Sequence, residues 1–365
     1  WASHLVVGSM LMWDQIIGQE RAVEALKNAV ARPVHAYLII GPRGSGVDEG
    51  ARALAGALVE ATDDTRVARG RHPDVVEFRP TANEYSIERD VRESILPEMH
   101  AAPIEGPRKC VLLLEAERLN DPSANALLKS IEEPPPRTVV ILVADSADAL
   151  PATIRSRCQR IDFGALTDDV VLRALEADGI GLEAAQLATS LAGGRLDRAR
   201  SLSGDFASLR LAFSDVPSRF GGYGASAAFL ASGLTSVLDD AVSKVEAEQA
   251  REIADADAEI ERMGYAARTA QAMRKRMQER QKRMLRRSRT DALLEGLAAM
   301  ESVYRDALAP DSLPLNIDRA PLNMSARDAS AGLDAVVKAR KACSSTPTEA
   351  LLLERLIINL PTAAN

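Results

Sequence analysis

The sequence predicts an α/β domain followed by an all-helical region, and three observations support this fold class. Residues 12–165 alternate between helical stretches and short apolar runs. The apolar runs are continuous, which is typical of parallel strands that are buried on both faces of a sheet. After residue 165 no further run of this kind occurs, and the chain is rich in the helix formers Ala, Leu, Glu and Arg.

Composition places the chain among globular proteins and excludes several other classes. Of its 365 residues 46% are hydrophobic and 27% are charged, and its formal net charge is −7, which is not typical of a protein that coats nucleic acid. It contains no run of about 18 apolar residues that could cross a membrane. Cys110, Cys158 and Cys343 lie far apart, which argues against a disulfide framework and favours reduced thiols in a cytoplasmic location.

The chain is predicted to have three structured parts after a short leader. Residues 1–11 resemble neither a signal peptide nor a core element, and Gly8-Ser9-Met10 is typical of a cloning remnant, so we expect the natural start near Met12. Residues 12–165 form the predicted α/β domain, and residues 166–205 form a small helical lid that is interrupted at Gly193-Gly194. Residues 206–365 form a helical C-terminal domain.

The elements of the α/β domain follow from local patterns. Helical periodicity predicts helices over residues 20–31 and 48–60, and short apolar runs predict strands over residues 34–40, 74–78, 111–114 and 139–143. A further helix is predicted over residues 121–133, because Asp121 can cap it, Pro122 fits its first turn and Pro134-Pro135-Pro136 ends it.

A glycine-rich loop follows the first predicted strand and precedes a helix, as a phosphate-binding loop does. Gly41, Gly44, Ser45 and Gly46 are the residues that would line such a site. The position of the lysine that contacts phosphate holds Val47, and the position of the hydroxyl that holds Mg²⁺ holds Asp48. A carboxylate at a helix N-terminus repels an anion and can itself cap the helix. We therefore expect no catalytic nucleotide binding here, although an ordinary glycine-rich turn remains an alternative for this motif.

A second element repeats this loss. Nucleotide hydrolysis needs two acidic residues at the end of a buried strand, one for the metal ion and one for the attacking water. The strand at residues 111–114 is followed by Glu115, which can replace the first acid, and by Ala116, which cannot replace the second.

Several motifs together resemble the clamp-loader branch of the AAA+ proteins. The two most specific are the run Asn125–Pro135, which ends in Ser130-Ile131-Glu132-Glu133-Pro134-Pro135, and the run Ile154-Arg155-Ser156-Arg157-Cys158 about twenty residues later. Supporting pieces are Ile17-Gly18-Gln19, His35-Ala36-Tyr37-Leu38 and His72-Pro73-Asp74. Within that branch the degenerate glycine loop is similar to the bacterial delta-prime type. The resemblance is strong over residues 13–163, fair through the lid, and limited to length and helicity in the C-terminal third.

The resemblance implies a function as well as a fold. It implies an AAA+ domain of the RecA-like type, a lid and a helical collar, in a DNA polymerase III component without its own ATPase activity. It further implies that Arg157 is an arginine finger that reaches the ATP site of a neighbouring subunit, with Ser156 and Cys158 as its motif partners. A guanidinium suits this role because it is always charged and presents a planar fork to phosphate oxygens. From spacing alone, an ordinary surface arginine after a strand is the favoured interpretation of Arg157.

The resemblance also implies the partners. These are the gamma/tau motor subunits and the delta subunit, with transient contact to the sliding clamp and primer-template DNA through the whole assembly and no membrane contact. Two other interpretations remain open. The chain could be an active AAA+ motor with an unusual loop, or an AAA+-derived module that binds DNA through its basic C-terminal segment.

Some positions depart from the family pattern. Most members carry a four-cysteine zinc module after the glycine loop, but residues 60–70 contain no cysteine, so we expect no zinc. The first sensor position, usually Thr or Asn, holds Asp145. The arginine of the second sensor is replaced by Asp197, with Arg195 and Arg198 beside it. We therefore expect no cofactor, and neither ATP nor ADP.

Two charged stretches follow one another in the C-terminal domain. Residues 246–261 are acidic, with Glu246, Glu248, Glu252, Asp255, Asp257, Glu259 and Glu261. Residues 274–289 are basic, with Arg274, Lys275, Arg276, Arg280, Lys282, Arg283, Arg286, Arg287 and Arg289. An antiparallel helix pair would let the two stretches neutralise each other, and contact with DNA phosphates or a partner is the alternative. The segment is similar to one in actinobacterial members of the delta-prime type.

Overall fold

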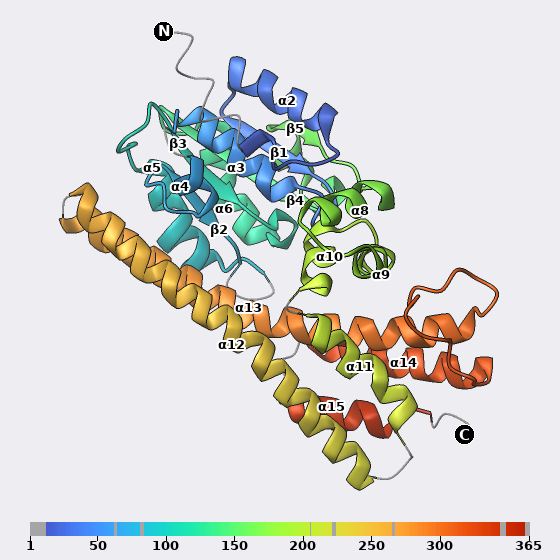
Figure 1. Cartoon of the computed structure of the whole chain (residues 1–365). Helices are drawn as coiled ribbons and strands as arrows, with labels where there is room; N and C mark the ends of the chain where they lie inside the picture. The colour runs from blue at the N-terminus through green and yellow to red at the C-terminus, as the bar shows by residue number, and fades with distance from the viewer. Residues whose placement is uncertain are drawn as a thin grey trace. The chain divides into compact units, whose positions relative to one another are not determined.

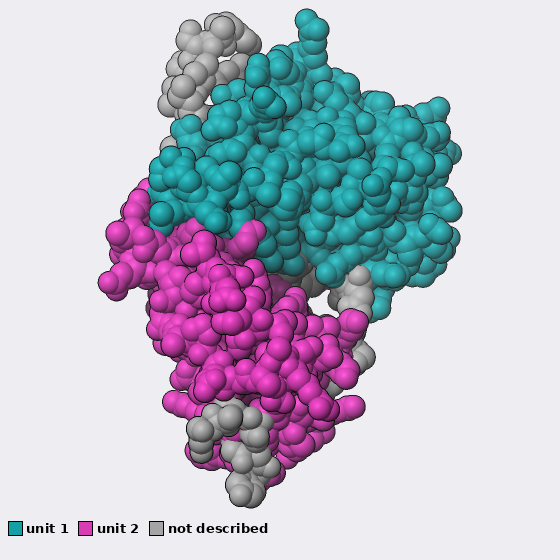
Figure 2. Space-filling model, turned by 90° about the vertical axis from the view of Figure 1, so that its right-hand side faces the viewer, with its two compact units in different colours: residues 1–174, 194–196 teal, residues 175–193, 197–365 magenta. Residues whose placement is uncertain are grey.

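The computed structural model describes residues 12–61, 64–80, 84–204, 206–220, 224–264, 267–343 and 348–361, so the predicted leader lies outside the described residues. The chain forms two compact units, which Figure 2 colours separately. Unit 1 comprises residues 1–174 and 194–196, and unit 2 comprises residues 175–193 and 197–365. Residues 166–205 are thus divided between the units, and the three-part organisation with a separate lid stays a prediction.

A five-stranded parallel sheet forms the centre of unit 1 (Figure 1). Its strands are β1 (Ala36–Ile40), β2 (Val75–Phe78), β3 (Lys109–Leu113), β4 (Thr138–Ala144) and β5 (Gln159–Asp162). They lie in the order β2-β3-β4-β1-β5. The α/β class and the first four strands are confirmed, whereas β5 was not predicted.

Helices cover both faces of this sheet because successive residues of a buried strand point to opposite sides. Ile39 belongs to the same core cluster as Leu26 and Leu54. The preceding residue, Leu38, belongs to the cluster on the other face, which contains Leu127. The helical segments are α2 (Glu20–Ala31), α3 (Val47–Leu58), α4 (Asp64–Ala68), η1 (Ile87–Ile95), α5 (Leu96–His100), η2 (Ala116–Arg118), α6 (Asp121–Glu132), η3 (Ala147–Ala149), α7 (Ala152–Arg155) and most of α8 (Asp168–Ala177).

Helix α6 begins as its sequence predicts, but with a different cap. The side chain of Asn120 accepts a hydrogen bond of 3.0 Å from the backbone N–H of Ser123, so Asn120 is the capping residue. The prediction that Asp121 caps this helix is therefore wrong, because Asp121 is already its first helical residue and is exposed. The helix ends at Glu132, two residues before Pro134, as expected from the proline run.

Unit 2 is helical in its described part, which confirms the prediction for the C-terminal region. Its helices are α9 (Leu182–Ala192), nearly all of α10 (Leu196–Ser203), α11 (Ala207–Arg219), α12 (Gly224–Met263), α13 (Ala267–Leu308), α14 (Ala326–Ala342) and α15 (Glu349–Ile358). One core cluster joins α11 to α15 and contains Phe213 and Tyr304. Gly332 allows α14 to approach α13, because a Cβ at this position would lie 2.3 Å from the Tyr304 ring.

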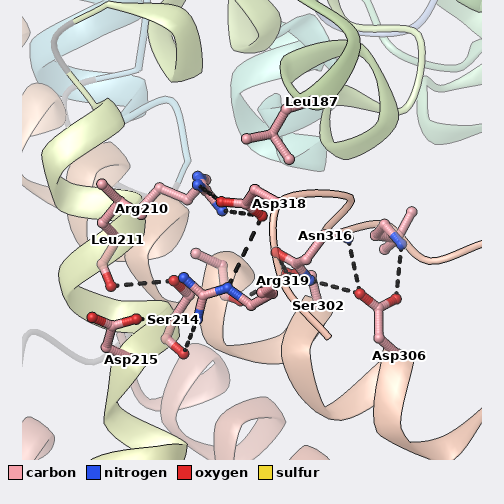
Figure 3. A network of polar contacts seen from close by, with 12 residues as sticks. Leu187, Arg210, Leu211, Ser214, Asp215, Ser302, Asp306, Asn316, Asp318 and Arg319 are labelled. Carbon is pink, nitrogen blue, oxygen red and sulfur yellow. Dashed lines mark hydrogen bonds and ion pairs between the residues drawn. The ribbon is translucent and has the colours of Figure 1, made fainter. Parts of the chain in front are cut away.

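Buried polar contacts fix the connection between α13 and α14 in unit 2 (Figure 3). The Asp306 carboxylate accepts hydrogen bonds from the backbone N–H groups of Leu315 and Asn316, at 2.8 and 2.9 Å, and from Asn316 Nδ2 at 2.8 Å. Further along, Asp318 forms an ion pair with the buried Arg210 of α11. Since buried polar groups need partners, these contacts hold the connection against α13 and α11.

The two charged stretches lie on the neighbouring long helices α12 and α13 (Figure 1). Arg274 Nε lies 3.0 Å from Asp257 Oδ1, and Arg274 Nη2 lies 3.3 Å from Glu261 Oε1, so the predicted helix pair is confirmed at this position. The side chains of Arg276, Arg280, Arg283, Arg286 and Arg287 lie outside the described part. Contact of this stretch with DNA stays a prediction.

Within the described residues, none of the helices has the length and apolar character that crossing a membrane requires.

Candidate functional site

The glycine loop is held as a turn between β1 and α3. Gly44 and Gly46 have backbone φ angles of 77° and 97°, in the left-handed region that glycine adopts without strain. Gln19 Nε2 donates a hydrogen bond of 3.1 Å to Ser45 O, and Leu196 N donates one of 3.2 Å to Gly44 O. The loop is therefore a fixed turn between β1 and α3, and it lacks the lysine and the hydroxyl with which a working loop binds phosphate and Mg²⁺.

Close packing explains Gly41, the first glycine of the loop. A Cβ at Gly41 would lie 2.6 Å from the Phe163 Cβ and 2.8 Å from the Phe163 carbonyl oxygen. Val47, where a working loop has its lysine, is buried and lies in the same core cluster as Phe163. An apolar side chain turned into the core cannot contact a phosphate.

Asp48 makes an ion pair instead of capping its helix. Helix α3 has Gly46 at its N-cap position and no side-chain cap, so the suggestion that Asp48 caps it is wrong. The carboxylate of Asp48 is paired with the guanidinium of Arg79, which follows β2. Burial opposes the charge on Arg79, but Asp48 and Glu115 outweigh it, so that the pKa of Arg79 is raised.

Arg79 connects the glycine loop to the acid that follows β3. Arg79 Nη1 lies 2.8 Å from Glu115 Oε1, while Arg118 Nε lies 3.1 Å from Glu115 Oε2. In a working site, the residue at the position of Asp48 and the acid at the position of Glu115 hold Mg²⁺ between them. Here a guanidinium of the chain itself bridges these two positions. The residues present therefore do not fit a Mg²⁺-nucleotide complex.

Further carboxylates at this edge of the sheet raise the local negative charge. Burial, and then repulsion from Asp145, raises the pKa of Glu117, and Asp145 N donates a weak hydrogen bond of 3.4 Å to Glu117 Oε2. Burial also raises the pKa of Asp145, while the charges of Arg43 and Arg195 act in the opposite direction. Carboxylates and arginines therefore lie together at this edge, while the lysine position of the loop holds Val47.

Arg157 lies at the opposite edge of the sheet from the glycine loop. Strands β1 and β5 are parallel, with Tyr37 opposite Gln159 and Ile40 opposite Asp162. Arg157 comes just before β5, whereas Gly41 comes just after β1. The five residues of β1 separate the two edges by roughly 13 Å at ~3.3 Å per residue. Arg157 therefore cannot serve the glycine loop of its own chain.

The Arg157 side chain is 38% exposed and its contacts all come from residues nearby on α6 and around α7. Arg157 Nε lies 2.5 Å from Glu132 Oε1, and Arg157 Nη1 donates hydrogen bonds to Thr153 O at 2.9 Å and Ser156 Oγ at 3.1 Å. Ser156 is exposed beside it, whereas Cys158 is half-buried and burial raises the pKa of its thiol to about 12. Cys158 is thus a packing residue with no nucleophilic thiolate at neutral pH.

The sequence did not reveal Arg79 or Glu132 as parts of these sites. Arg79 follows a strand that neighbours β3 in a parallel sheet, and the ends of such strands meet at one edge. The position of Arg79 directly after a strand could have indicated its role, but only if the order of the strands in the sheet had been known. Glu132 lies inside the run that carries the family resemblance. The sequence of this run does not indicate that Glu132 contacts Arg157.

The three residues predicted for the second sensor have different surroundings. Asp197 is exposed, and Arg198 forms an ion pair of 2.7 Å with Glu295 of α13. The charge of Arg195, like that of Arg43, acts to lower the pKa of Asp145.

The described residues contain no cluster of three or more His, Cys, Asp or Glu side chains suited to a metal ion. The expectation that the chain needs neither zinc nor nucleotide stays a prediction.

Comparison with known proteins identifies relatives of unit 1. The family described as "DNA polymerase III, delta subunit" matches residues 18–167. Subunit tau of DNA polymerase III from Bacillus subtilis (strain 168) is 31% identical in an alignment of 220 residues that covers 53% of this chain and 38% of that protein. Subunit delta' from Pseudomonas aeruginosa is 36% identical in an alignment of 159 residues that covers 40% of this chain and 45% of that protein.

The similarity covers less than half of each of these curated relatives. Among solved structures, a gamma subunit-related protein of DNA polymerase III from Thermotoga maritima aligns with 92% of this chain and 96% of its own. Its sequence identity is 19% and its TM-score is 0.45.

Proposed function

The chain belongs to the bacterial clamp-loader family of AAA+ proteins, and from this premise we propose that it is a delta-prime-type subunit without ATPase activity. In this proposal it assembles with gamma/tau motor subunits and a delta subunit. It contributes Arg157 to the ATP site of the adjacent motor subunit, in an assembly that loads the sliding clamp on primer-template DNA.

The glycine loop supports the first half of the proposal. Val47 is buried where a phosphate-binding lysine would stand, and Ala116 is buried where the second acid would stand. Arg79 pairs with both Asp48 and Glu115, the two residues at the metal-binding positions. A Mg²⁺-nucleotide complex would have to break these two ion pairs without gaining a lysine in return. An active motor, the alternative interpretation, would need all of these positions to be intact.

The position of Arg157 is the single observation that carries the second half. Its side chain is exposed at the sheet edge opposite to its own glycine loop. An arginine that serves a phosphate from this position must serve one that another chain holds. In such a site the guanidinium stabilises the negative charge that develops on the transferred phosphoryl group.

Replacement of Arg157 by alanine tests this role in the reconstituted clamp loader. We expect Arg157→Ala to leave assembly intact and to lower the DNA-stimulated ATP turnover of the complex. An arginine finger supplied in trans contributes ~10³–10⁵ in single-site GTPases, and since one site among several is affected here, a total fall of about two- to tenfold is expected.

The control variant is Arg160→Ala, which removes an exposed arginine of β5 whose ion pair is with Asp162 of the same strand. It should turn over ATP at the rate of the unmodified complex. An Arg157→Ala complex that assembles fully and keeps the unmodified rate contradicts the proposal.

A further inference from the structure

Arg157 is held by an acidic side chain that nothing in the proposed function uses. We propose that Glu132 is a positioning residue, which orients the Arg157 guanidinium before a neighbouring ATP site is met; this inference rests on the proposed role of Arg157. The ion pair joins Arg157 Nε to Glu132 Oε1 at 2.5 Å.

The contacts of Arg157 leave one nitrogen available. Nε faces Glu132, and Nη1 donates to the oxygens of Thr153 and Ser156. Nη2 makes no hydrogen bond to any residue that the structure describes. The guanidinium is therefore held through two of its nitrogens, and Nη2 remains to donate to a phosphate oxygen.

Both partners stand on firmly held backbone. Glu132 is the last residue of α6, directly after the buried Ile131, and the helix is capped at its other end by Asn120. Arg157 N donates a hydrogen bond of 3.1 Å to the carbonyl of Ile154, which is fully buried. Because neither backbone is free to move away, the pair restricts the side chain of Arg157.

Restricting the Arg157 side chain should have a measurable effect on turnover. An arginine that must be immobilised on docking loses rotamer entropy, and prior immobilisation avoids a loss that corresponds to about a two- to tenfold effect. The effect cannot be much larger, because the two side chains are 38% and 43% exposed and exposed ion pairs are weak. Glu132 acts through Arg157, so its effect should disappear when Arg157 is absent.

The test uses the reconstituted complex and the isosteric replacement Glu132→Gln, which removes the charge and keeps the shape. We expect the DNA-stimulated kcat to fall about two- to tenfold, with the KM for ATP unchanged because ATP is bound by the neighbouring chain. The difference from the unmodified complex should shrink as ionic strength rises, since salt screens an exposed pair. A change in packing alone would not depend on salt in this way.

The matched control is Glu133→Gln, which removes the same charge from the next residue. Glu133 is exposed and forms no ion pair within the described residues, so this variant should keep the unmodified kcat. A second test combines Glu132→Gln with Arg157→Ala. The combined variant should have the kcat of Arg157→Ala alone, as expected for a residue that acts only through its partner.

The outcomes separate this inference from the proposed function. If Arg157→Ala lowers turnover while Glu132→Gln does not, or raises it, the positioning role is wrong and the proposed function stands. The same conclusion follows if Glu133→Gln lowers turnover equally, or if Glu132→Gln lowers it further in the Arg157→Ala background. If Arg157→Ala itself has no effect on an assembled complex, the proposed function fails first.

Discussion

At the scale of single residues, Arg79 bridges the two positions that hold a metal ion in a working phosphate-loop site. This arginine pairs with Asp48 at the start of α3 and with Glu115 after β3. The two carboxylates replace groups that would hold a metal ion, and without a cation they would repel each other. The guanidinium of Arg79 thus supplies a positive charge between the two carboxylates, where a working site has Mg²⁺.

Removal of this charge should therefore lower stability. We expect Arg79→Ala to reduce the free energy of unfolding by about 1–3 kcal/mol, because it leaves the mostly buried Glu115 with one ion pair fewer and Asp48 without its partner. Urea unfolding followed by circular dichroism measures the change. Arg92→Ala, which breaks a well-exposed pair with Glu88, should cost no more than about 0.5 kcal/mol. Equal effects of the two variants would show that Arg79 is an ordinary surface arginine.

Cys158 offers a pH-dependent test at the same scale. Burial raises the pKa of its thiol to about 12, so at pH 8 only roughly one molecule in 10⁴ carries the reactive thiolate. Alkylation by iodoacetamide in the folded protein should be far slower than for free cysteine, and its rate should rise about tenfold per pH unit between pH 8 and pH 10. Mass spectrometry of peptides that contain Cys158 measures this rate. Alkylation at the rate of free cysteine at pH 8 would mean that the thiol is accessible and ionised.

Residue identity predicted which motif positions depart from a working nucleotide site better than it predicted the new contacts of those positions. Val47, Asp48 and Ala116 were recognisable because a known motif fixes which residue belongs at each position. Arg79 was not recognisable because its role depends on β2 lying next to β3, which local sequence does not specify. For the same reason the pairing of Glu132 with Arg157 required coordinates.

At the scale of elements, apolar strands were predictable and the polar edge strand was not. The strands β1, β3 and β4 are buried along their whole length and therefore appear as continuous apolar runs. In β5 the residues Gln159, Arg160 and Asp162 are exposed and Ile161 alone is buried. An edge strand with one apolar residue lacks the signal on which the prediction depends.

The start of α6 gives a prediction at this scale. We expect Asn120→Ala to lower the free energy of unfolding by about 0.5–2 kcal/mol, because the backbone N–H of Ser123 loses its acceptor. The change Asp121→Ala one residue later should cost less, about 0.5 kcal/mol or below, since an exposed acid in the first turn contributes only through the helix dipole. Denaturant unfolding of both variants distinguishes them, and a larger effect of Asp121→Ala would restore the cap that the sequence suggested.

At the scale of the whole molecule, the order of α/β and helical regions was predictable, whereas the predicted separate lid stays a prediction. Helix α8 falls mostly into unit 1, while α9 and nearly all of α10 belong to unit 2. Ser190 of α9 illustrates why, because its hydroxyl donates a hydrogen bond of 2.7 Å to the carbonyl of Leu315, 125 residues away. Long-range contacts of this kind leave no periodic signal in the sequence.

A delta-prime-type subunit as proposed performs no phosphate chemistry at its own glycine loop. Titration of the purified chain with Mg²⁺-ATP, combined with an assay for released phosphate, tests this claim most directly. We expect the purified chain to show no saturable binding at micromolar nucleotide and no phosphate release above background. Micromolar binding that requires Mg²⁺, together with steady release of phosphate by the chain alone, would contradict it.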